Sequence, residues 1–412
     1  MNIQYTFRAL KSRNFALFFF GQFVSRVGMW MQRTAVIWVV YSITHSAFMI
    51  GVATFAEQFP SFVFSVRGGL IADRYNRYKV LMLTQTLSAL QAIALTVFTF
   101  SGNYNIAIIL GLSAFLGIVN AYDVPVRQSM INEIIGKKED LANGIALNAT
   151  LNMLARLAGP ALAGVVLVKY GADYCFLSNA VSFIAVIGAI AAMRFPKNTF
   201  SVHKTKAKSK FKEALDYLEE NKAIATVIWI AALSSFFVLP YVTLLPVYAK
   251  VIFKGNAATY GWLNAAIGVG AFVGTFYLAS LNKDADLRKV LLFNIFVGGV
   301  SLLLFSYSSN LYLSLFFSII SGFSSILQSA VIMTIVQSET ADKLRGRVVS
   351  LIAMAMFGML PLGSLLVGYL APIAGAPLTL FGEGILGIII GIIFYKNLIN
   401  TSLSLKKTNN GK

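Results

Sequence analysis

The chain has 412 residues, of which 57% are hydrophobic and only 12% are charged, and its formal net charge is +18. This composition excludes an ordinary soluble globular protein, because too few polar residues remain to cover so much apolar mass. The single cysteine, Cys175, excludes an intramolecular disulfide, and two histidines are too few to favour a metal or catalytic centre. No metal and no cofactor are therefore expected.

Twelve apolar segments are long enough to cross a membrane. A helix needs about 20 mostly apolar residues for this, since each residue rises about 1.5 Å through a core about 30 Å thick. Backbone groups in lipid must be paired within the segment, so each segment is predicted to be a helix. The fold class is an all-α membrane protein whose twelve transmembrane helices cover residues 15–43, 48–66, 78–100, 104–126, 141–168, 174–194, 222–249, 257–281, 287–308, 310–337, 346–370 and 376–396.

The charge distribution predicts the orientation and two halves. Basic residues gather in alternate loops, which predicts an inner (plasma) membrane protein with both termini cytoplasmic. The basic total indicates contact with anionic lipid headgroups, and no nucleic acid is expected. The longest polar segment, residues 195–221, is predicted to link six-helix bundles at 1–194 and 222–412. Its second part is predicted to be a short amphipathic helix, because three apolar residues have helical spacing: Phe211, Leu215 and Leu218.

An internal repeat favours transport. The segment EIIGKKEDLANGIALN, between spans four and five, has a counterpart in VQSETADKLRGRVVSL between spans ten and eleven, 203 residues further on. Transporters built from two parallel six-helix halves enclose a site near the bilayer midplane and move one half against the other. No GxxxxGK[ST] sequence occurs, so nothing indicates a nucleotide-driven pump.

The loop GGLIADRYNRYK at residues 68–79 resembles the loop motif of the major facilitator superfamily. Asn76 replaces a glycine of that motif and Tyr78 a basic residue, but asparagine tolerates a left-handed backbone, so the turn is expected to survive. The resemblance implies gating, in which a carboxylate caps the N-terminus of span eleven near Arg345 in one transport state only. Cytoplasmic charges on a tight turn would explain the arginines but not the aspartate. The matching residues are Gly69, Asp73, Arg74 and Arg77.

A second motif lies in span five, where the sequence is RLAGPALAG. It resembles the glycine-proline motif of antiporters in the same superfamily, which implies export. The motif residues Gly159, Pro160 and Gly164 would kink the helix and let a neighbouring backbone approach closely, although ordinary packing of small residues is the alternative.

Three further stretches carry a resemblance within that superfamily. SRNFALFFFGQFVSRVGMWMQRTAVIWVVY, NAYDVPVRQSMINEIIGKKEDLANGIALN and DKLRGRVVSL resemble the branch that includes enterobactin exporters and the transmembrane secretion effector group. The resemblance is strongest over the first 165 residues and weaker in the second half, where the loop at 281–290 lacks the motif. It implies export of siderophores, drugs or other amphiphilic metabolites, generally by proton antiport.

Ionisable residues inside the spans are the candidate site, because each is costly in lipid and usually faces a cavity or a partner. Helical rise places Arg33 and Glu57 each about 15 Å from the outer boundary, so they are predicted to pair. By the same measure Arg26 lies about 25 Å and Asp123 about 27 Å deep. The candidates for proton coupling are Glu57, Asp123 and Glu383, and those for the substrate cavity are Arg26, Arg33, Arg156 and Trp30.

The leading hypothesis is that Glu57 exchanges a proton as Arg33 or substrate approaches or leaves it, because an adjacent cation favours the ionised carboxylate. A static salt bridge is the alternative. Asp123 and Arg127, at positions i and i+4, either stabilise their helix or relay gating with Asp73. Glu383 has no basic residue nearby in sequence and is expected to carry a proton at rest. The three arginines favour an anionic or catecholate substrate.

The sequence therefore predicts a secondary active transporter and no enzyme. We expect a proton-coupled exporter of a siderophore or similar anionic amphiphile that works by alternating access. A multidrug efflux antiporter, a lysophospholipid-type lipid transporter and a non-transporting scaffold remain alternatives. The expected partners are a small-molecule substrate, protons and the lipid bilayer, and the protein is expected to be a monomer.

Overall fold

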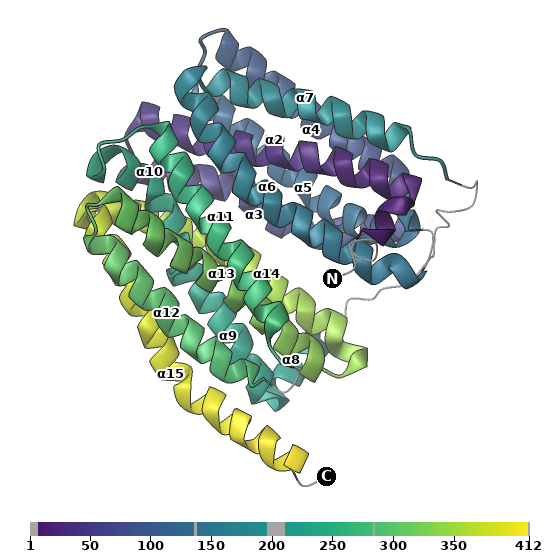
Figure 1. Cartoon of the computed structure of the whole chain (residues 1–412), viewed down its shortest axis with the longest axis vertical. Helices are drawn as coiled ribbons and strands as arrows, with labels where there is room; N and C mark the ends of the chain where they lie inside the picture. The colour runs from purple at the N-terminus through teal and green to yellow at the C-terminus, as the bar shows by residue number, and fades with distance from the viewer. Residues whose placement is uncertain (1–6, 136–137, 196–210, 283–284, 411–412) are drawn as a thin grey trace. The chain divides into compact units, whose positions relative to one another are not determined.

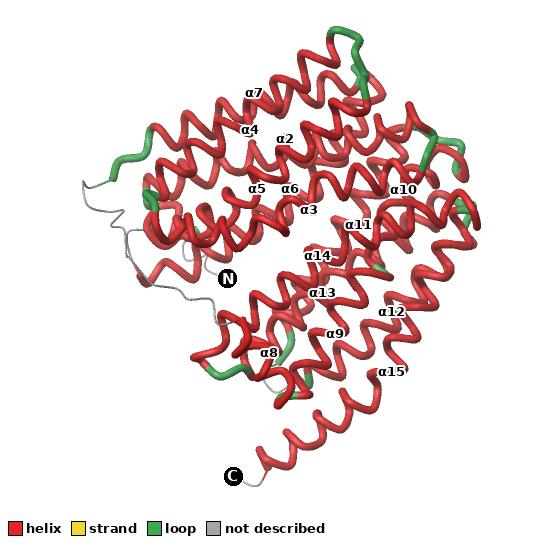
Figure 2. Tube along the Cα trace, turned by 180° about the vertical axis from the view of Figure 1, so that it is seen from behind, coloured by secondary structure: helices red, strands yellow, loops and turns green. Residues whose placement is uncertain are grey.

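The computed structural model describes residues 7–135, 138–195, 211–282 and 285–410. Within these ranges the secondary structure is helical and contains no strand, as the tube in Figure 2 shows. The first part of the predicted linker, residues 196–210, lies outside the described residues. The all-helical prediction is confirmed.

Eleven helical segments in the described ranges are long and apolar enough to cross a membrane. They are α3 (Ala47–Arg74), α4 (Arg77–Phe100), α5 (Ile106–Ile134), α6 (Leu141–Lys169), α7 (Ala172–Ala191), the composite segment Lys222–Ile252, α11 (Ala257–Ser280), α12 (Leu287–Tyr307), α13 (Leu311–Glu339), α14 (Asp342–Ala374) and α15 (Ala376–Asn410). The remaining predicted span is α2 (Arg13–Thr44), whose 32 residues exceed the length required. Each predicted span is thus helical.

Three predicted spans end well before their helices. Helix α3 continues to Arg74 rather than 66, α5 to Ile134 rather than 126, and α15 to Asn410 rather than 396. In each case the apolar run stops at a basic residue, but the helical backbone does not. A helix needs only its own hydrogen bonds to continue, so it extends beyond the apolar part that lipid requires.

The seventh span is not a single α-helix. α9 (Lys222–Phe237) is followed by the 3-10 turn η3 (Leu239–Leu244), the short α10 (Leu245–Val247) and the π-helix η4 (Tyr248–Ile252). Pro240 and Pro246 lie in this part, and proline removes one N–H donor from a helix. The change of helix type follows from these two prolines.

Two compact units make up the chain. The first contains Met1–Ile43, Ala56–Ala207 and Asn256–Ala265, and the second contains Thr44–Phe55, Lys208–Gly255 and Ala266–Lys412. Helices α3 and α11 are each divided between the units. Each unit has its own apolar core, with Phe15, Leu81 and Met130 fully buried in the first and Val227, Leu291 and Val331 in the second.

The same packing recurs within each unit. In the first unit α4 packs against α5 and α7, and in the second α12 packs against α13 and α15. Figure 1 shows α4 beside α7, and α12 beside α15. These are the third, fourth and sixth spans of each half, so the packing supports the internal repeat seen in the sequence.

The link between the last two spans of each half is also shared. Gly171 joins α6 to α7 with φ of 97°, and Gly375 joins α14 to α15 with φ of 85°. Residues with a side chain rarely adopt this conformation, so both turns depend on glycine.

The predicted amphipathic helix is present as α8 (Phe211–Glu220). It belongs to the second unit, where Tyr217 and Leu218 pack against the apolar core. Glu213 forms an ion pair with Arg347 near the start of α14. Helix α8 is therefore packed against the rest of the second unit.

Candidate functional site

Arg33 on α2 and Glu57 on α3 form an ion pair, with 3.2 Å between Nε and Oε2. The pairing expected from helix depth is present. The side chain of Arg33 is 32% exposed and that of Glu57 is 16% exposed. Both groups therefore remain accessible, in contrast to a fully buried pair, and this is the property that exchange of a proton or substrate requires.

Trp30 lies beside two guanidinium groups. The guanidinium carbon of Arg33 is 5.3 Å from its ring centroid and that of Arg156, on α6, is 5.7 Å away. The negative face of an aromatic ring attracts a cation at this range. Trp30 thus contacts both guanidinium groups.

One further aromatic residue, Tyr260, belongs to this cluster and was not predicted with it. Tyr260, from the part of α11 that belongs to the first unit, stacks on Trp38 with ring centroids 5.9 Å apart. Tyr260 is only 4% exposed and lies close enough to Arg33 and Glu57 to interact with them electrostatically. The sequence carries no signal for this role, because an aromatic residue in a span most often packs against lipid or other helices. We call Trp30, Arg33, Glu57, Arg156 and Tyr260 the Arg33–Glu57 cluster.

A second polar cluster surrounds Asp123 on α5. Its carboxylate accepts hydrogen bonds from Thr84 Oγ1 at 2.8 Å and Gln85 Nε2 at 2.7 Å, both on α4, and pairs with Arg127 at 3.1 Å. The Asp123 side chain is 3% exposed. Three helical neighbours thus satisfy a carboxylate that is closed to solvent, which favours the interpretation of Asp123 as a structural anchor over a role in proton exchange.

Arg26 on α2 belongs to the same cluster. It donates to Gln22 at 3.5 Å, and it lies near enough to Asp123 and Arg127 to interact electrostatically. Arg127 also donates to Gln22 at 3.4 Å. Arg26 therefore lies apart from Arg33, with which it shares a helix face, and is 6% exposed. We call Gln22, Arg26, Thr84, Gln85, Asp123 and Arg127 the Asp123 cluster.

The loop motif contributes a helix cap and an anchor. Asn76 has φ of −62°, so the prediction of a left-handed turn at this residue is wrong. Asn76 instead caps α4, where its side chain accepts a hydrogen bond from the backbone N–H of Lys79 at 3.1 Å. Asparagine suits the N-cap because its short side chain reaches that donor. Asp73 and Arg74, at the end of α3, are exposed.

Arg77 fixes the end of α3 to α5. It donates to the carbonyl of Ala72 at 2.9 Å and forms an ion pair with Glu133. Gly69, the remaining motif residue, has open space where a side chain would begin. The motif arginine therefore has a local structural role within the first unit.

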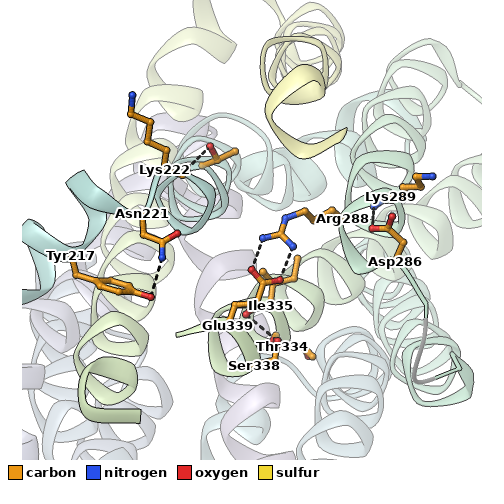
Figure 3. Close-up of polar contacts among 11 residues, drawn as sticks. Tyr217, Asn221, Lys222, Asp286, Arg288, Lys289, Thr334, Ile335, Ser338 and Glu339 are labelled. Atoms are coloured by element: carbon orange, nitrogen blue, oxygen red, sulfur yellow. Dashed lines mark hydrogen bonds and ion pairs between the residues drawn. The ribbon is translucent and has the colours of Figure 1, made fainter. Parts of the chain in front are cut away.

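The second unit has an equivalent pair. Arg288, on α12, donates from Nη1 and Nη2 to the two carboxylate oxygens of Glu339 on α13, at 2.6 and 2.5 Å (Figure 3). Asp286 caps α12 through the backbone N–H of Lys289, as Asn76 caps α4. A helix cap followed by an arginine–glutamate pair thus recurs at 281–290, although the loop motif itself is absent there.

Glu383 on α15 lies in the second unit, and no basic residue is among those that line the cavity beside it. It is 3% exposed, and among the described residues neither carboxylate oxygen has a hydrogen-bond partner.

The glycine-proline motif, Gly159, Pro160 and Gly164, lies in α6, and this helix continues unbroken through Pro160. A side chain at Gly164 would approach the Cα atoms of Ala258 and Gly261 on α11 to 3.1 Å, so this motif does permit a close backbone approach.

A side chain added at Gly159 is expected to disturb the packing of α6 against Trp30. A Cβ atom there would lie 2.4 Å from the Cβ of Trp30, so Gly159→Ala must displace Trp30 or α6. We expect a loss of about 1–3 kcal/mol in the free energy of unfolding, as in other overpacked cores. Gly188→Ala on α7 is the matched control, because nothing lies within 4 Å of its Cβ, and it should be neutral or slightly stabilising. Equal melting temperatures of the two variants in detergent would contradict the contact.

Comparison with known proteins gives one family. The family model described as transmembrane secretion effector matches residues 4–409. The chain is 28% identical to the Staphyloferrin A transporter of Staphylococcus aureus, over 94% of this chain and 97% of that protein. It is 23% identical to the Multidrug efflux pump Tap of Mycolicibacterium fortuitum (92% and 94%) and 24% identical to the Enterobactin exporter EntS of Salmonella choleraesuis (92% and 92%).

Solved structures share the arrangement of helices. A bacterial homologue of the iron transporter ferroportin, in an inward-facing state, matches with a TM-score of 0.71 at 15% identity, over 94% of this chain and 98% of that chain. A POT family transporter in complex with 5-aminolevulinic acid matches with a TM-score of 0.75 at 13% identity, over 94% and 97%. At these identities the likeness shows the fold.

Proposed function

Because the chain belongs to the transmembrane secretion effector family and has the twelve-helix fold of the major facilitator superfamily, we propose that this transporter is a proton-coupled exporter of an anionic, siderophore-like metabolite. It works by alternating access in the inner (plasma) membrane, as a monomer with both termini cytoplasmic. The exposed carboxylate of Asp73 at the end of α3 has the gating role, in which it binds a helix N-terminus in one transport state only.

The accessible Arg33–Glu57 pair supports this proposal most strongly. An ion pair in a membrane span is costly, and a purely structural pair would be expected to be closed to solvent, as the Asp123 cluster is. Arg33 instead keeps 32% of its side chain exposed. The carboxylates of Glu57 and Asp123 thus have different environments, and we assign the accessible one, Glu57, to proton exchange.

The position of Arg33 supports the proposed proton coupling. The Arg33 guanidinium lies 3.2 Å from the Glu57 carboxylate and pairs with it. In the alternate transport state Arg33 moves away, and the carboxylate that has lost its cation takes up a proton. A proton that is bound in one state and released in the other moves against the substrate in each cycle.

The charges favour an anionic substrate. Arg33 and Arg156 both lie at Trp30, so the Arg33–Glu57 cluster offers two cations, an aromatic face and one carboxylate. An anionic aromatic molecule can bind the arginines and stack on the ring. The relatives named for staphyloferrin A and enterobactin agree with export of a metabolite. Multidrug efflux is the second candidate, because other relatives are named Multidrug efflux pump Tap and Macrolide efflux protein A.

Transport by purified protein in liposomes tests the substrate class. We expect an imposed proton gradient to drive a catecholate chelator such as 2,3-dihydroxybenzoylserine at least tenfold faster than ethidium or lysophosphatidylcholine, because only the first is an anion with an aromatic ring. Liposomes without protein and liposomes without a gradient are the controls. A preference for ethidium would replace the proposal with drug efflux, and a preference for the lipid would replace it with lipid transport.

A further inference from the structure

Glu383 is a buried carboxyl group that the protein leaves without a polar partner. Its side chain is on α15, it is 3% exposed, and no described residue forms a hydrogen bond with Oε1 or Oε2. Burying an ionised carboxylate in this way is very costly, so the group is held as a neutral acid with one O–H donor. The Asp123 cluster shows the contrast, because there three side chains satisfy the carboxylate.

A cavity of about 190 Å³ has Glu383 among its lining residues. Its walls come from α9, α14 and α15, all in the second unit, and include Phe236, Phe237, Leu366 and Leu386. An apolar cavity of about 150 Å³ is large enough to hold benzene. The Glu383 cavity therefore has room for an aromatic ring with a small substituent.

Glu383 is the one unpaired polar side chain among the residues that line the cavity. The only other polar side chain in this lining is Thr379, whose hydroxyl donates to the carbonyl of Gly375 at 2.9 Å. Tyr248 is near enough to interact electrostatically with Glu383, but its hydroxyl donates to the carbonyl of Ser306 at 3.3 Å. No basic side chain lines the cavity. A ligand must therefore bring its own polar group to Glu383.

The mouth of the cavity is apolar. Leu370 and Leu378 line it and are 39% and 60% exposed, so the cavity reaches the surface of the unit between α14 and α15. Exposed apolar residues on a membrane span favour a ligand that arrives dissolved in an apolar phase. A hydrophilic anion is excluded by this rim and by the lack of a cation inside.

We propose that the Glu383 cavity is a second ligand site, which binds a lipophilic amine of about the size of a substituted benzene ring. The proton on the Glu383 carboxyl moves to the amine nitrogen, so that the O–H bond breaks, an N–H bond forms, and an ammonium–carboxylate pair results. The free neutral acid and a protonated amine in water hold two protons, and the bound pair holds one. Binding from water therefore releases one proton.

This inference is independent of the proposed function. The Arg33–Glu57 cluster is in the first unit and favours anions, whereas the Glu383 cavity is in the second unit and favours amines. Binding to the Glu383 cavity can be measured without transport, so failure of either proposal leaves the other in place.

Binding of two matched probes tests the site. N,N-dimethylbenzylamine and isobutylbenzene have nearly the same shape, and the amine has a nitrogen atom where the hydrocarbon has a CH group. With the full chain in lipid nanodiscs, and with empty nanodiscs subtracted, we expect ligand-observed NMR to show the amine binding at least tenfold more tightly. We also expect its affinity to rise about tenfold per pH unit while the free amine is protonated, because one proton is released.

Three variants identify the group responsible. Glu383→Gln keeps the shape but removes the acidic proton, so it should abolish both the preference for the amine and the pH dependence. Gly382→Leu should abolish binding of both probes, because Gly382 lines the cavity and nothing lies within 4 Å of its Cβ. Glu133→Gln, which removes a carboxylate outside both clusters, should bind as the wild type does. Equal affinity for amine and hydrocarbon in the wild type, or an unchanged preference in Glu383→Gln, would overturn the proposal.

Discussion

Glu57→Gln is expected to reduce proton-driven substrate efflux at least tenfold. Glutamine keeps the size and polarity of the side chain, so it can still accept a hydrogen bond from Arg33, but it cannot exchange a proton at any physiological pH. Substrate binding should change by less than threefold, because the arginines and Trp30 remain. The rate in proteoliposomes should also lose its dependence on pH.

Glu133→Gln is the matched control for this substitution. It also removes the carboxylate of an arginine–glutamate pair, the one with Arg77, but at the ends of α4 and α5 and outside both clusters. We expect its efflux to keep the pH dependence of the wild type. Efflux by Glu57→Gln at the wild-type rate and with an unchanged pH profile would reduce the Arg33–Glu57 pair to a static salt bridge.

Asp123→Ala is expected to cause the largest loss of stability. Removing this carboxylate leaves the buried Arg26 and the partly buried Arg127 without this anion and takes the acceptor from Thr84 and Gln85. Breaking a buried ion pair on one side typically costs about 3–5 kcal/mol. We expect a loss of this size in the free energy of unfolding, measured by denaturation in detergent.

Asp123→Asn separates charge from hydrogen bonding at the same position. Its amide oxygen can still accept from Thr84 and Gln85, so part of the cluster survives and the loss should be smaller than for alanine. Transport by Asp123→Asn that recovers when substrate or lipid stabilises the folded protein would show that Asp123 acts as a structural anchor. A folded Asp123→Ala protein with wild-type stability would contradict the account of the cluster.

The helices were predictable because lipid restricts the choice of structure. Each apolar run of sufficient length had to be a helix, and the glycine and proline positions left the spans intact. The ends of α3 and α5 were not predictable from apolar runs, since the helices continue beyond the apolar part. Apolar runs also failed to predict the change of helix type in the seventh span, where two prolines alter the helix without ending the span.

The candidate site was predictable only where it is charged. Helix depth alone paired Arg33 with Glu57, because charges in lipid are few and need partners. Thr84, Gln85 and Tyr260 escaped prediction, because uncharged polar and aromatic side chains are common in spans and the contacts depend on how α4 and α11 are rotated. The prediction of a left-handed turn at Asn76 was wrong because asparagine suits a helix cap as well as a left-handed turn.

The most direct test is proton movement driven by a substrate gradient. Proteoliposomes loaded with a catecholate substrate and a pH-sensitive dye are diluted into medium without substrate and without a proton gradient. The account predicts that wild-type protein moves protons inward as substrate leaves, and that Glu57→Gln moves none. Substrate efflux without proton entry in the wild type, or unchanged proton entry in Glu57→Gln, would contradict it.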